Sequence, residues 1–513
     1  MLHPRRRTAR VSPLTAAPHW HLFLSLYLAF SVTACGTLGP ITVDEQPAVL
    51  ERLEKPKICV ALSGGGLRSA AFSTGVLRSL YLDGALHKVD ILSATSGGAW
   101  SVLWLHARLA DGNSLADIYG VSRDVDTSTI RELETRSFIG PIWKAWTVAW
   151  GPMRAAFAAY YASIASKFGR PFQKTSIAAI NNNIEKHRIP VPVINVSSFR
   201  PCNSDDSEIK RYGADGPQLA ERMQELMPFG QHLIELTPQY WGSKALGYSS
   251  TFPFEVRNME DWARVASAAV DAPGYRNCEA LRALGITFGA HVPTPETSSA
   301  RTVEQKKIFL ADGGFVDNLA ARSLFDRGCE TVLISDAEHD PTLNFEAYRR
   351  LQKDLSTDGK RLIVSRIDDW ILRRGSDRCP KDGPCFQADN AANGLVNNSA
   401  FEGCLTTHET CEAPGQEPTR VIYLKLSIDP LAVNERRLNP AVTDFYLKSI
   451  NGPSCKEPRG TDADCSFPHT PTFKTDYGEE EYRAYRLLGE DIMRLNRVSE
   501  ILIQDTQNNL NGF

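Results

Sequence analysis

The sequence predicts an α/β fold in which helices enclose a largely parallel sheet. Two observations lead to this prediction. Short apolar segments, typical of buried strands, alternate along the chain with longer helical patterns. Early in this alternation, a glycine-rich turn and a serine-containing turn each connect an apolar strand to a helix. Alternation of this kind is typical of sheets whose neighbouring strands run in parallel.

The first two units can be placed residue by residue. A strand is expected over 57–62, a glycine loop over 63–66 and a helix over 67–86. A second strand over 89–94 leads directly to Ser96, and a second helix follows over 97–112. Further strands are expected at 190–198, 232–238, 306–314, 331–339, 361–368 and 419–429, and one long helix at 478–505.

Composition narrows the class of protein. With 513 residues, 42% of them hydrophobic and 23% charged, the chain has a globular composition. A formal net charge of -3 argues against a general nucleic-acid binder. The sequence contains no pattern typical of a zinc finger, P-loop or coiled coil.

The N-terminus predicts export. A basic start is followed by an apolar stretch over 21–32 that is too short to span a bilayer, and then by Val-Thr-Ala-Cys ending at Cys35. This layout resembles the bacterial lipobox, which implies cleavage after residue 34, acylation of Cys35 and a linker over 35–50. Gly36, by the same resemblance, favours the outer membrane. The alternative is an ordinary signal peptide with an incidental cysteine.

The cysteines are consistent with an exported protein. Three pairs with short spacing lie in loop-like sequence, and we expect them to form disulfides: Cys379 with Cys385, Cys404 with Cys411, and Cys455 with Cys465. A zinc site built from the first four is the alternative. Cys202 and Cys278 could form a long-range pair, whereas Cys59 and Cys329 lie in apolar surroundings and are expected to be buried free thiols.

The two turns carry candidate chemistry. Ser96 lies between a buried strand and a helix rich in small residues, where a strained turn exposes the serine hydroxyl. Gly64, Gly65 and Gly66 have the composition of an oxyanion hole, in which backbone N–H groups converge on one oxygen. Arg68 could fix this loop or attract an anionic headgroup. A phosphate-binding loop is the alternative, but no Gly-Lys-Ser/Thr follows these glycines.

A serine nucleophile needs a base, and Asp312 is the candidate. It ends an apolar strand and precedes two glycines, so its carboxylate could reach a neighbouring turn. A surface Asp-Gly turn is the alternative. His339 is the only plausible third member of a triad. The acidic stretch around it, 336–340, could bind a metal, although a solvated strand end is the simpler interpretation.

Taken in order, G-G-G-x-R at 64–68, the serine turn at 96 and D-G-G at 312–314 resemble the patatin-like phospholipase family. The segment 267–275 adds to the resemblance, which covers roughly residues 55–340. It implies a three-layer sandwich and a Ser–Asp dyad, with Ser96 as nucleophile, Asp312 as general base and Gly64 to Gly66 as oxyanion hole.

The resemblance also implies a substrate. A membrane phospholipid or acylglycerol would be hydrolysed through an acyl-enzyme, with no metal or other cofactor. The catalytic domain would occupy 51–350, and a C-terminal extension with disulfide-rich loops and a terminal helix would occupy 351–513. A catalytically silent lipid-binding or scaffold lipoprotein, and an acyltransferase using the same dyad, are the alternative functions.

A tryptophan-rich stretch at 141–172 leaves two interpretations open. Trp143, Trp146 and Trp150 recur at helical spacing, and the stretch contains basic residues but no acidic ones. Such a segment suits a membrane interface. It could equally be a pair of core helices that pack over the sheet.

Overall fold

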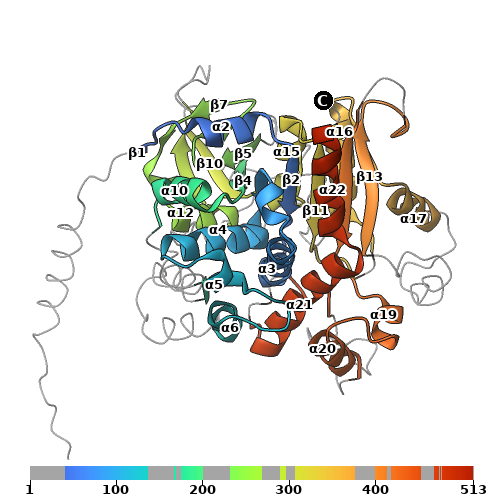
Figure 1. Cartoon of the computed structure of the whole chain (residues 1–513). Helices are drawn as coiled ribbons and strands as arrows, with labels where there is room; N and C mark the ends of the chain where they lie inside the picture. The colour runs from blue at the N-terminus through green and yellow to red at the C-terminus, as the bar shows by residue number, and fades with distance from the viewer. Residues whose placement is uncertain are drawn as a thin grey trace, which may run out of the picture. The chain divides into compact units, whose positions relative to one another are not determined.

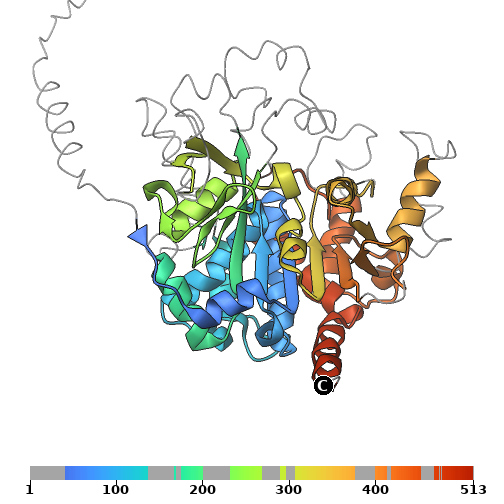
Figure 2. The same ribbon diagram turned by 90° about the horizontal axis from the view of Figure 1, so that it is seen from above.

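Five parallel strands form the centre of a mixed twelve-stranded sheet (Figures 1 and 2). In sheet order these five are β14 (Thr419–Lys425), β11 (Thr331–Asp336), β2 (Ile58–Leu62), β3 (Ile91–Ala94) and β4 (Val191–Phe199). Helices cover both faces. The predicted fold class, an α/β sandwich with a largely parallel central sheet, is therefore confirmed.

The computed structural model describes most of the chain beyond the N-terminal forty residues. The described residues are 41–136, 167–168, 175–199, 232–268, 289–295, 307–341, 343–375, 399–412, 417–451, 467–472, 474 and 476–511. The N-terminal segment that carries Cys35 lies outside these ranges.

Antiparallel strands extend the sheet on both sides. Beyond β14 lie β13 (Ala400–Thr406) and β12 (Arg361–Ile363), and beyond β4 lie β5 (His232–Leu236), β6 (Trp241–Ser243) and β7 (Gly247–Ser249). Strands β12, β13 and β14 come from the region that we expected to be a C-terminal extension. They continue the same sheet, and residues 41–513 form one unit.

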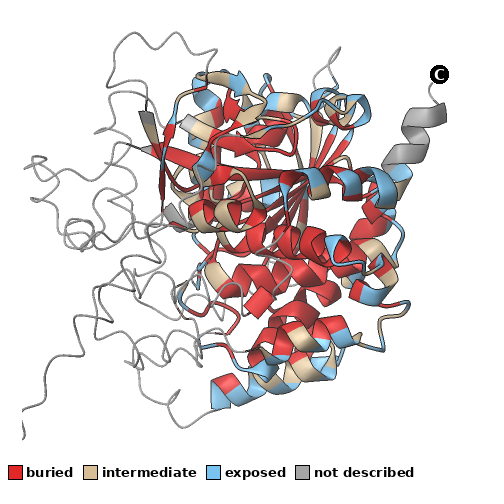
Figure 3. Ribbon diagram, turned by 90° about the vertical axis from the view of Figure 1, so that its left-hand side faces the viewer, coloured by how far each residue is buried: buried red, intermediate tan, exposed pale blue. Residues whose placement is uncertain are grey.

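The helices that matter most for the site lie on one face of the sheet. α3 (Gly66–Leu82) and α4 (Ser96–Ala110) lie side by side there, and α2 (Pro47–Glu54), α15 (Arg322–Arg327) and α16 (Glu346–Thr357) lie on the other face (Figure 1). Nearly every residue of α3 and α4 is buried. Figure 3 shows that buried residues fill the centre of the molecule. Both helices are therefore enclosed on all sides, which fixes their N-termini in place.

The C-terminal helix α21 (Glu479–Leu495) packs closely against α3. A β-carbon on Gly75 would overlap the backbone of Arg486, and one on Gly489 would lie 2.5 Å from the carbonyl oxygen of Phe72. Arg78 of α3 donates to both carboxylate oxygens of Glu490, at 2.9 and 2.8 Å. The C-terminal part of the chain is thus bound to the helix that begins at the glycine loop.

Several predicted elements end a few residues earlier than expected, and two differ more. The expected strand at 361–368 ends at Ile363, because the Asp368 carboxylate accepts from the Val364 amide, 3.0 Å away, and begins helix α17 (Ser365–Gly375). The expected long terminal helix is two helices, α21 and α22 (Val498–Asn511). Arg497, at φ 51°, separates them because this backbone conformation cannot continue a right-handed helix.

The remaining α-helices of the described residues surround this core. They are α5 (Leu115–Tyr119), α6 (Ser128–Thr135), α10 (Ile177–His187), α12 (Met259–Ala266), α14 (Gly314–Asp317), α19 (Pro430–Asn434) and α20 (Pro440–Asn451). Beside β4, the strands β10 (Lys307–Asp312) and β9 (Ala290–Pro293) complete the twelve strands of the sheet, and β1 (Ile41–Thr42) pairs with β8 (Thr251–Phe252) in a separate two-stranded sheet. None of the helices in the described part of the chain is both long and apolar enough to cross a bilayer.

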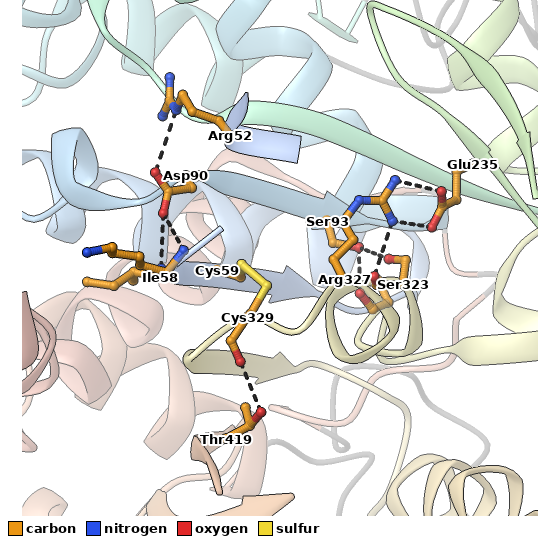
Figure 4. The surroundings of a disulfide bond; sticks show 12 residues. Arg52, Ile58, Cys59, Asp90, Ser93, Glu235, Ser323, Arg327, Cys329 and Thr419 are labelled. Carbon is orange, nitrogen blue, oxygen red and sulfur yellow. Dashed lines mark hydrogen bonds and ion pairs between the residues drawn. A yellow bond between two sulfur atoms is a disulfide. The ribbon is translucent and has the colours of Figure 1, made fainter. Parts of the chain in front are cut away.

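The cysteines confirm one prediction and correct another. Cys404 and Cys411 form the expected disulfide. Cys59 and Cys329, expected to be free thiols, are joined in a buried disulfide with their Cα atoms 6.2 Å apart (Figure 4). The two cysteines are 270 residues apart in the sequence, and they meet because β2 and β11 are neighbours in the sheet. The sequence alone does not show that these strands are neighbours, so the prediction was wrong. Cys202, Cys278, Cys379, Cys385, Cys455 and Cys465 lie outside the described residues.

Candidate active site

Ser96 occupies a strained turn between a strand and a helix. It is the first residue of α4, two positions after β3 ends at Ala94, and its φ is 47°. A non-glycine residue in this left-handed region stores of order 1–3 kcal/mol and persists only where its surroundings enforce it. Ala94, which stands where many serine turns have glycine, belongs to the extended strand and carries no such strain. The half-buried Ser96 side chain is therefore held at the end of the strand.

Asp312 reaches Ser96 by a route that the sequence did not predict. The sequence predicted a largely parallel sheet, but β10, the strand that ends at Asp312, is antiparallel to β4. Strand β4 is longer than β3: residues 191–194 pair with β3, and residues 196–199 pair with β10 on the same side. The ends of β3 and β10 therefore meet head to head beside Asn195, which brings Ser96 and Asp312 together.

The Asp312 carboxylate is almost completely enclosed. Its exposed fraction is 4%, it accepts a hydrogen bond from the Gly314 amide at 2.8 Å, and the nearby Ser96 hydroxyl also stabilises its ionised form. Burial raises the pKa of Asp312 to about 7, against the opposing effect of these two donors. A carboxylate with this pKa, beside a serine hydroxyl, can accept the serine proton near neutral pH.

The glycine loop supplies candidate oxyanion donors, though not all three that we predicted. The Gly64 amide donates to the Asn318 carbonyl at 2.8 Å, so its hydrogen is already engaged. Among the described residues, the amides of Gly65 and Gly66 have no such acceptor. Their φ values of 138° and 64° suit glycine alone. Sequence reasoning missed Asn318, although it follows Asp312 in the same segment, because its contact is made through the backbone.

The N-termini of two helices meet at the loop. Gly97, the residue after Ser96, is so close to Gly66 that a β-carbon on Gly97 would overlap the Gly66 carbonyl oxygen. A β-carbon on Gly98 would overlap the carbonyl oxygen of Leu62, at the end of β2. Helices α3 and α4 thus both direct their positive ends at the space beside Ser96, where they favour negative charge.

Arg68 is a buried support of this loop. Its side chain is fully buried, and its guanidinium donates to the carbonyl oxygens of Ala337, at 2.9 Å, and Thr470. A third contact joins Nη2 to the Thr472 hydroxyl at 3.3 Å. Of the two roles we considered, these contacts match the fixing of the loop, because a fully buried guanidinium held by three acceptors cannot contact a lipid headgroup.

The acidic stretch after β11 is not a solvated strand end. Asp336, Glu338 and Asp340 are buried, and all three contact the ammonium group of Lys425, at 2.7, 3.0 and 3.0 Å. Burial raises the pKa of Glu338 to about 7, although Lys425 opposes this shift. The lysine occupies the position between the carboxylates that a cation would take, which explains this unusual density of buried acids.

His339 lies beside the C-terminal part of the chain. Its imidazole is near the backbone of Thr470 and His469, and burial lowers its pKa. Within the described ranges, the groups that stabilise the ionised Asp312 carboxylate are the Gly314 amide and the Ser96 hydroxyl, and neither is a histidine.

Only the end of the tryptophan-rich stretch can be placed. Phe168 is buried, with its ring 5.7 Å from that of Trp100, and the Lys167 ammonium lies over the Tyr482 ring. These two residues belong to the core. Trp143, Trp146 and Trp150 lie outside the described residues, as does the segment 269–275.

Comparison with known proteins agrees with this geometry. A family model described as patatin-like phospholipase matches residues 60–325, which contain the glycine loop, Ser96 and Asp312. The chain is similar in structure to human GIVD cytosolic phospholipase A2, with a TM-score of 0.53 and 13% sequence identity over 89% of this chain and 62% of that one.

The same human enzyme in complex with methyl gamma-linolenyl fluorophosphonate and terbium chloride gives a TM-score of 0.44 and 13% identity, covering 90% of this chain and 62% of that one. The chain thus spans less than two thirds of the length of these structures. No curated protein sequence matches it. The family match covers more than half of the chain and includes each turn of the site, and the chain therefore belongs to the patatin-like phospholipase family.

Proposed function

We propose that this protein hydrolyses acyl esters of membrane glycerolipids with Ser96 as nucleophile and Asp312 as the only side-chain base. The observation that carries the proposal is the approach of the strained Ser96 hydroxyl to the buried Asp312 carboxylate, at the point where β3 and β10 meet. Family membership supports a lipid ester as the substrate class.

The geometry accounts for the first half of the reaction. As the Ser96 oxygen attacks the ester carbonyl, its proton passes to Asp312, and the carbonyl oxygen becomes an oxyanion. The amides of Gly65, Gly66 and Gly97 lie at the two helix N-termini that favour this charge. When the carbon–oxygen bond to the leaving alcohol breaks, the proton on Asp312 passes to that alcohol and leaves an acyl-enzyme.

The second half reverses these roles. Asp312, again ionised, takes a proton from a water molecule that attacks the acyl-enzyme, and the Ser96 oxygen leaves with that proton. The fatty acid is released and the free serine is restored. A carboxylate with a pKa near 7 can act both as the base and as the acid in this cycle.

Product analysis tests this proposal directly. Purified protein is incubated with vesicles of mixed phospholipids and acylglycerols, and the lipids are followed by mass spectrometry. We expect free fatty acid and the matching lyso- or partial glycerolipid, at a rate well above that of the Ser96→Ala protein. A product formed only when an alcohol acceptor is added would identify an acyltransferase. Lipid binding without turnover would identify a silent lipid-binding protein.

The raised pKa of Asp312 predicts a pH dependence. The base acts only when ionised, so kcat/KM should fall about tenfold for each pH unit below about 7 and level off above it. A soluble short-chain ester assayed between pH 5 and 9 provides the measurement. A rate that stayed constant from pH 5 to pH 8 would contradict the proposal that a carboxylate with this raised pKa takes the proton.

We also propose that the protein is exported and anchored in a bacterial membrane, the outer membrane being favoured, through an acylated Cys35. The disulfides Cys59–Cys329 and Cys404–Cys411 support export, because such bonds persist mainly outside the cytosol. A lipid anchor would also hold the enzyme at the surface where its substrate lies.

Replacing Cys35 tests the anchor. Cys35→Ser should move the protein from the membrane fraction to the soluble fraction, or leave an unprocessed precursor, because serine cannot receive the thioether-linked lipid. Fractionation and intact mass measure both effects. The matched control, Cys411→Ser, should remain in the membrane. Retention and processing of Cys35→Ser equal to the wild type would contradict the proposal.

A further inference from the structure

Residues 467–472 lie far along the chain from the family match, which ends at residue 325, yet they contact the glycine loop. The carbonyl oxygen of Thr470 and the hydroxyl of Thr472 accept from Arg68, two residues after Gly66. A β-carbon on Gly66 itself would overlap the Thr472 carbonyl oxygen. The segment therefore lies directly behind one of the candidate oxyanion donors.

Three other parts of the molecule hold this segment in place. The Thr470 hydroxyl contacts the hydroxyls of Tyr477 and Tyr485, and the Phe467 ring lies 4.7 Å from that of Tyr485. From the loop after β11, the Asp340 amide donates to His469 Nδ1 at 3.3 Å. Since Tyr485 belongs to α21, which packs on α3, the contacts form a closed ring: α3, the segment, α21 and α3 again.

The side chain of Arg68 joins this ring of contacts to the glycine loop, and the planar shape of its guanidinium matters for this role. Its planar guanidinium reaches three acceptors on two elements, and one of its nitrogens would lie 3.0 Å from a β-carbon on Gly65. All three acceptors are neutral. A lysine could keep the charge but could not reach acceptors in three directions, because its ammonium is a compact group on a flexible stem.

We propose that segment 467–472 positions the oxyanion donors Gly65 and Gly66 through Arg68, so that the C-terminal part of the chain is a working component of the active site. This inference rests on the proposed function. It assigns Arg68 and Thr472 as positioning residues for the acyl-transfer steps and assigns neither to the binding of a lipid headgroup.

The test compares Arg68→Lys and Thr472→Val on two substrates, a neutral soluble ester and an anionic phospholipid. Misplacement of the oxyanion donors lowers the rate of chemistry, so Arg68→Lys should reduce kcat about 10²-fold on both substrates with KM little changed. Thr472→Val, which removes one acceptor of a charged donor, should reduce kcat about tenfold. The double variant should be no slower than Arg68→Lys alone, because both changes break one interaction.

Matched controls separate positioning from stability. Arg327 of α15 lies on the other face of the sheet and pairs with Glu235 of β5, so Arg327→Lys should lower the melting temperature without reducing kcat. Thr443→Val, on α20 away from the loop, should change neither. If the Arg68→Lys protein does not fold, the kcat of Thr472→Val is the deciding measurement. A decrease in that kcat of less than twofold overturns the inference.

Other outcomes also overturn it. A loss confined to the anionic phospholipid would show that Arg68 recognises the headgroup. Losses that multiply in the double variant would show that Arg68 and Thr472 act separately. If Ser96→Ala is inactive while Arg68→Lys keeps full kcat, this inference fails and the proposed function stands. If Ser96→Ala remains active, the proposed function itself fails.

Discussion

Ser96→Ala should reduce ester hydrolysis about 10⁴-fold or more, because no covalent intermediate can form without the hydroxyl. Asp312→Asn should reduce it about 10²–10⁴-fold, because the amide cannot accept the serine proton. Both losses should appear in kcat on a soluble short-chain ester, where binding to a lipid surface plays no part. A fluorophosphonate probe should label the wild type rapidly, Asp312→Asn slowly, and Ser96→Ala not at all.

Both variants should remain folded. The amide oxygen of an asparagine at 312 can still accept from the Gly314 amide. The raised pKa means that ionising Asp312 in the folded protein costs free energy, and this cost is fully present above pH 7. Asp312→Asn removes it, so its melting temperature at pH 8 should be no lower than that of the wild type. Thermal unfolding at pH 8 checks this.

His339→Ala is the matched control for a dyad. Its imidazole contacts the backbone of Thr470 and His469, so its loss should change kcat only a few-fold. A loss as large as that of Ser96→Ala would show that the site works as a triad. Full activity in Asp312→Asn would show that another group takes the proton, and the assignment of Asp312 would then be wrong.

Much of this site could be predicted from local sequence. A strand followed by a glycine loop and a helix, and a strand followed by a serine and a helix, each lie within one short stretch, so the turns could be placed before their neighbours were known. The residues around Asp312 were also sufficient to predict that it lies at the end of a strand. The sequence also predicted that Asp312 could reach Ser96, but for the wrong reason. Only the register of β10 on β4 shows that the ends of β3 and β10 meet head to head.

The parts that were missed depend on contacts between distant residues. Arg68 contacts Thr470, 402 residues further on, and Cys59 is bonded to Cys329. Neither pairing can be predicted from periodicity or spacing. The disulfide depends on the order of strands in the sheet, and the Arg68 contact depends on the later part of the chain packing against α3. The burial of the acids at 336–340 was missed for the same reason, because their partner Lys425 comes from another strand.

Gly97→Ala should be the most damaging change that leaves every titrating group in place. The added methyl group would overlap the carbonyl oxygen of Gly66, so either the turn at Ser96 or the oxyanion loop must move. A displacement near 1 Å in an active site costs about 10²-fold in rate. Forcing an extra methyl group into a packed interior costs about 1–3 kcal/mol of stability. We therefore expect kcat to fall at least 10²-fold and the melting temperature to fall as well.

Gly478→Ala is the control, because its φ of -72° suits alanine and a β-carbon there would meet no atom within 4 Å. It should retain wild-type kcat and nearly the wild-type melting temperature. Fluorophosphonate labelling of Gly97→Ala, carried out well below its melting temperature, separates misplacement from unfolding: a folded protein that labels slowly has lost alignment of Ser96 with its donors. A folded Gly97→Ala protein with wild-type kcat would show that the close approach of the two helix N-termini is not what stabilises the oxyanion.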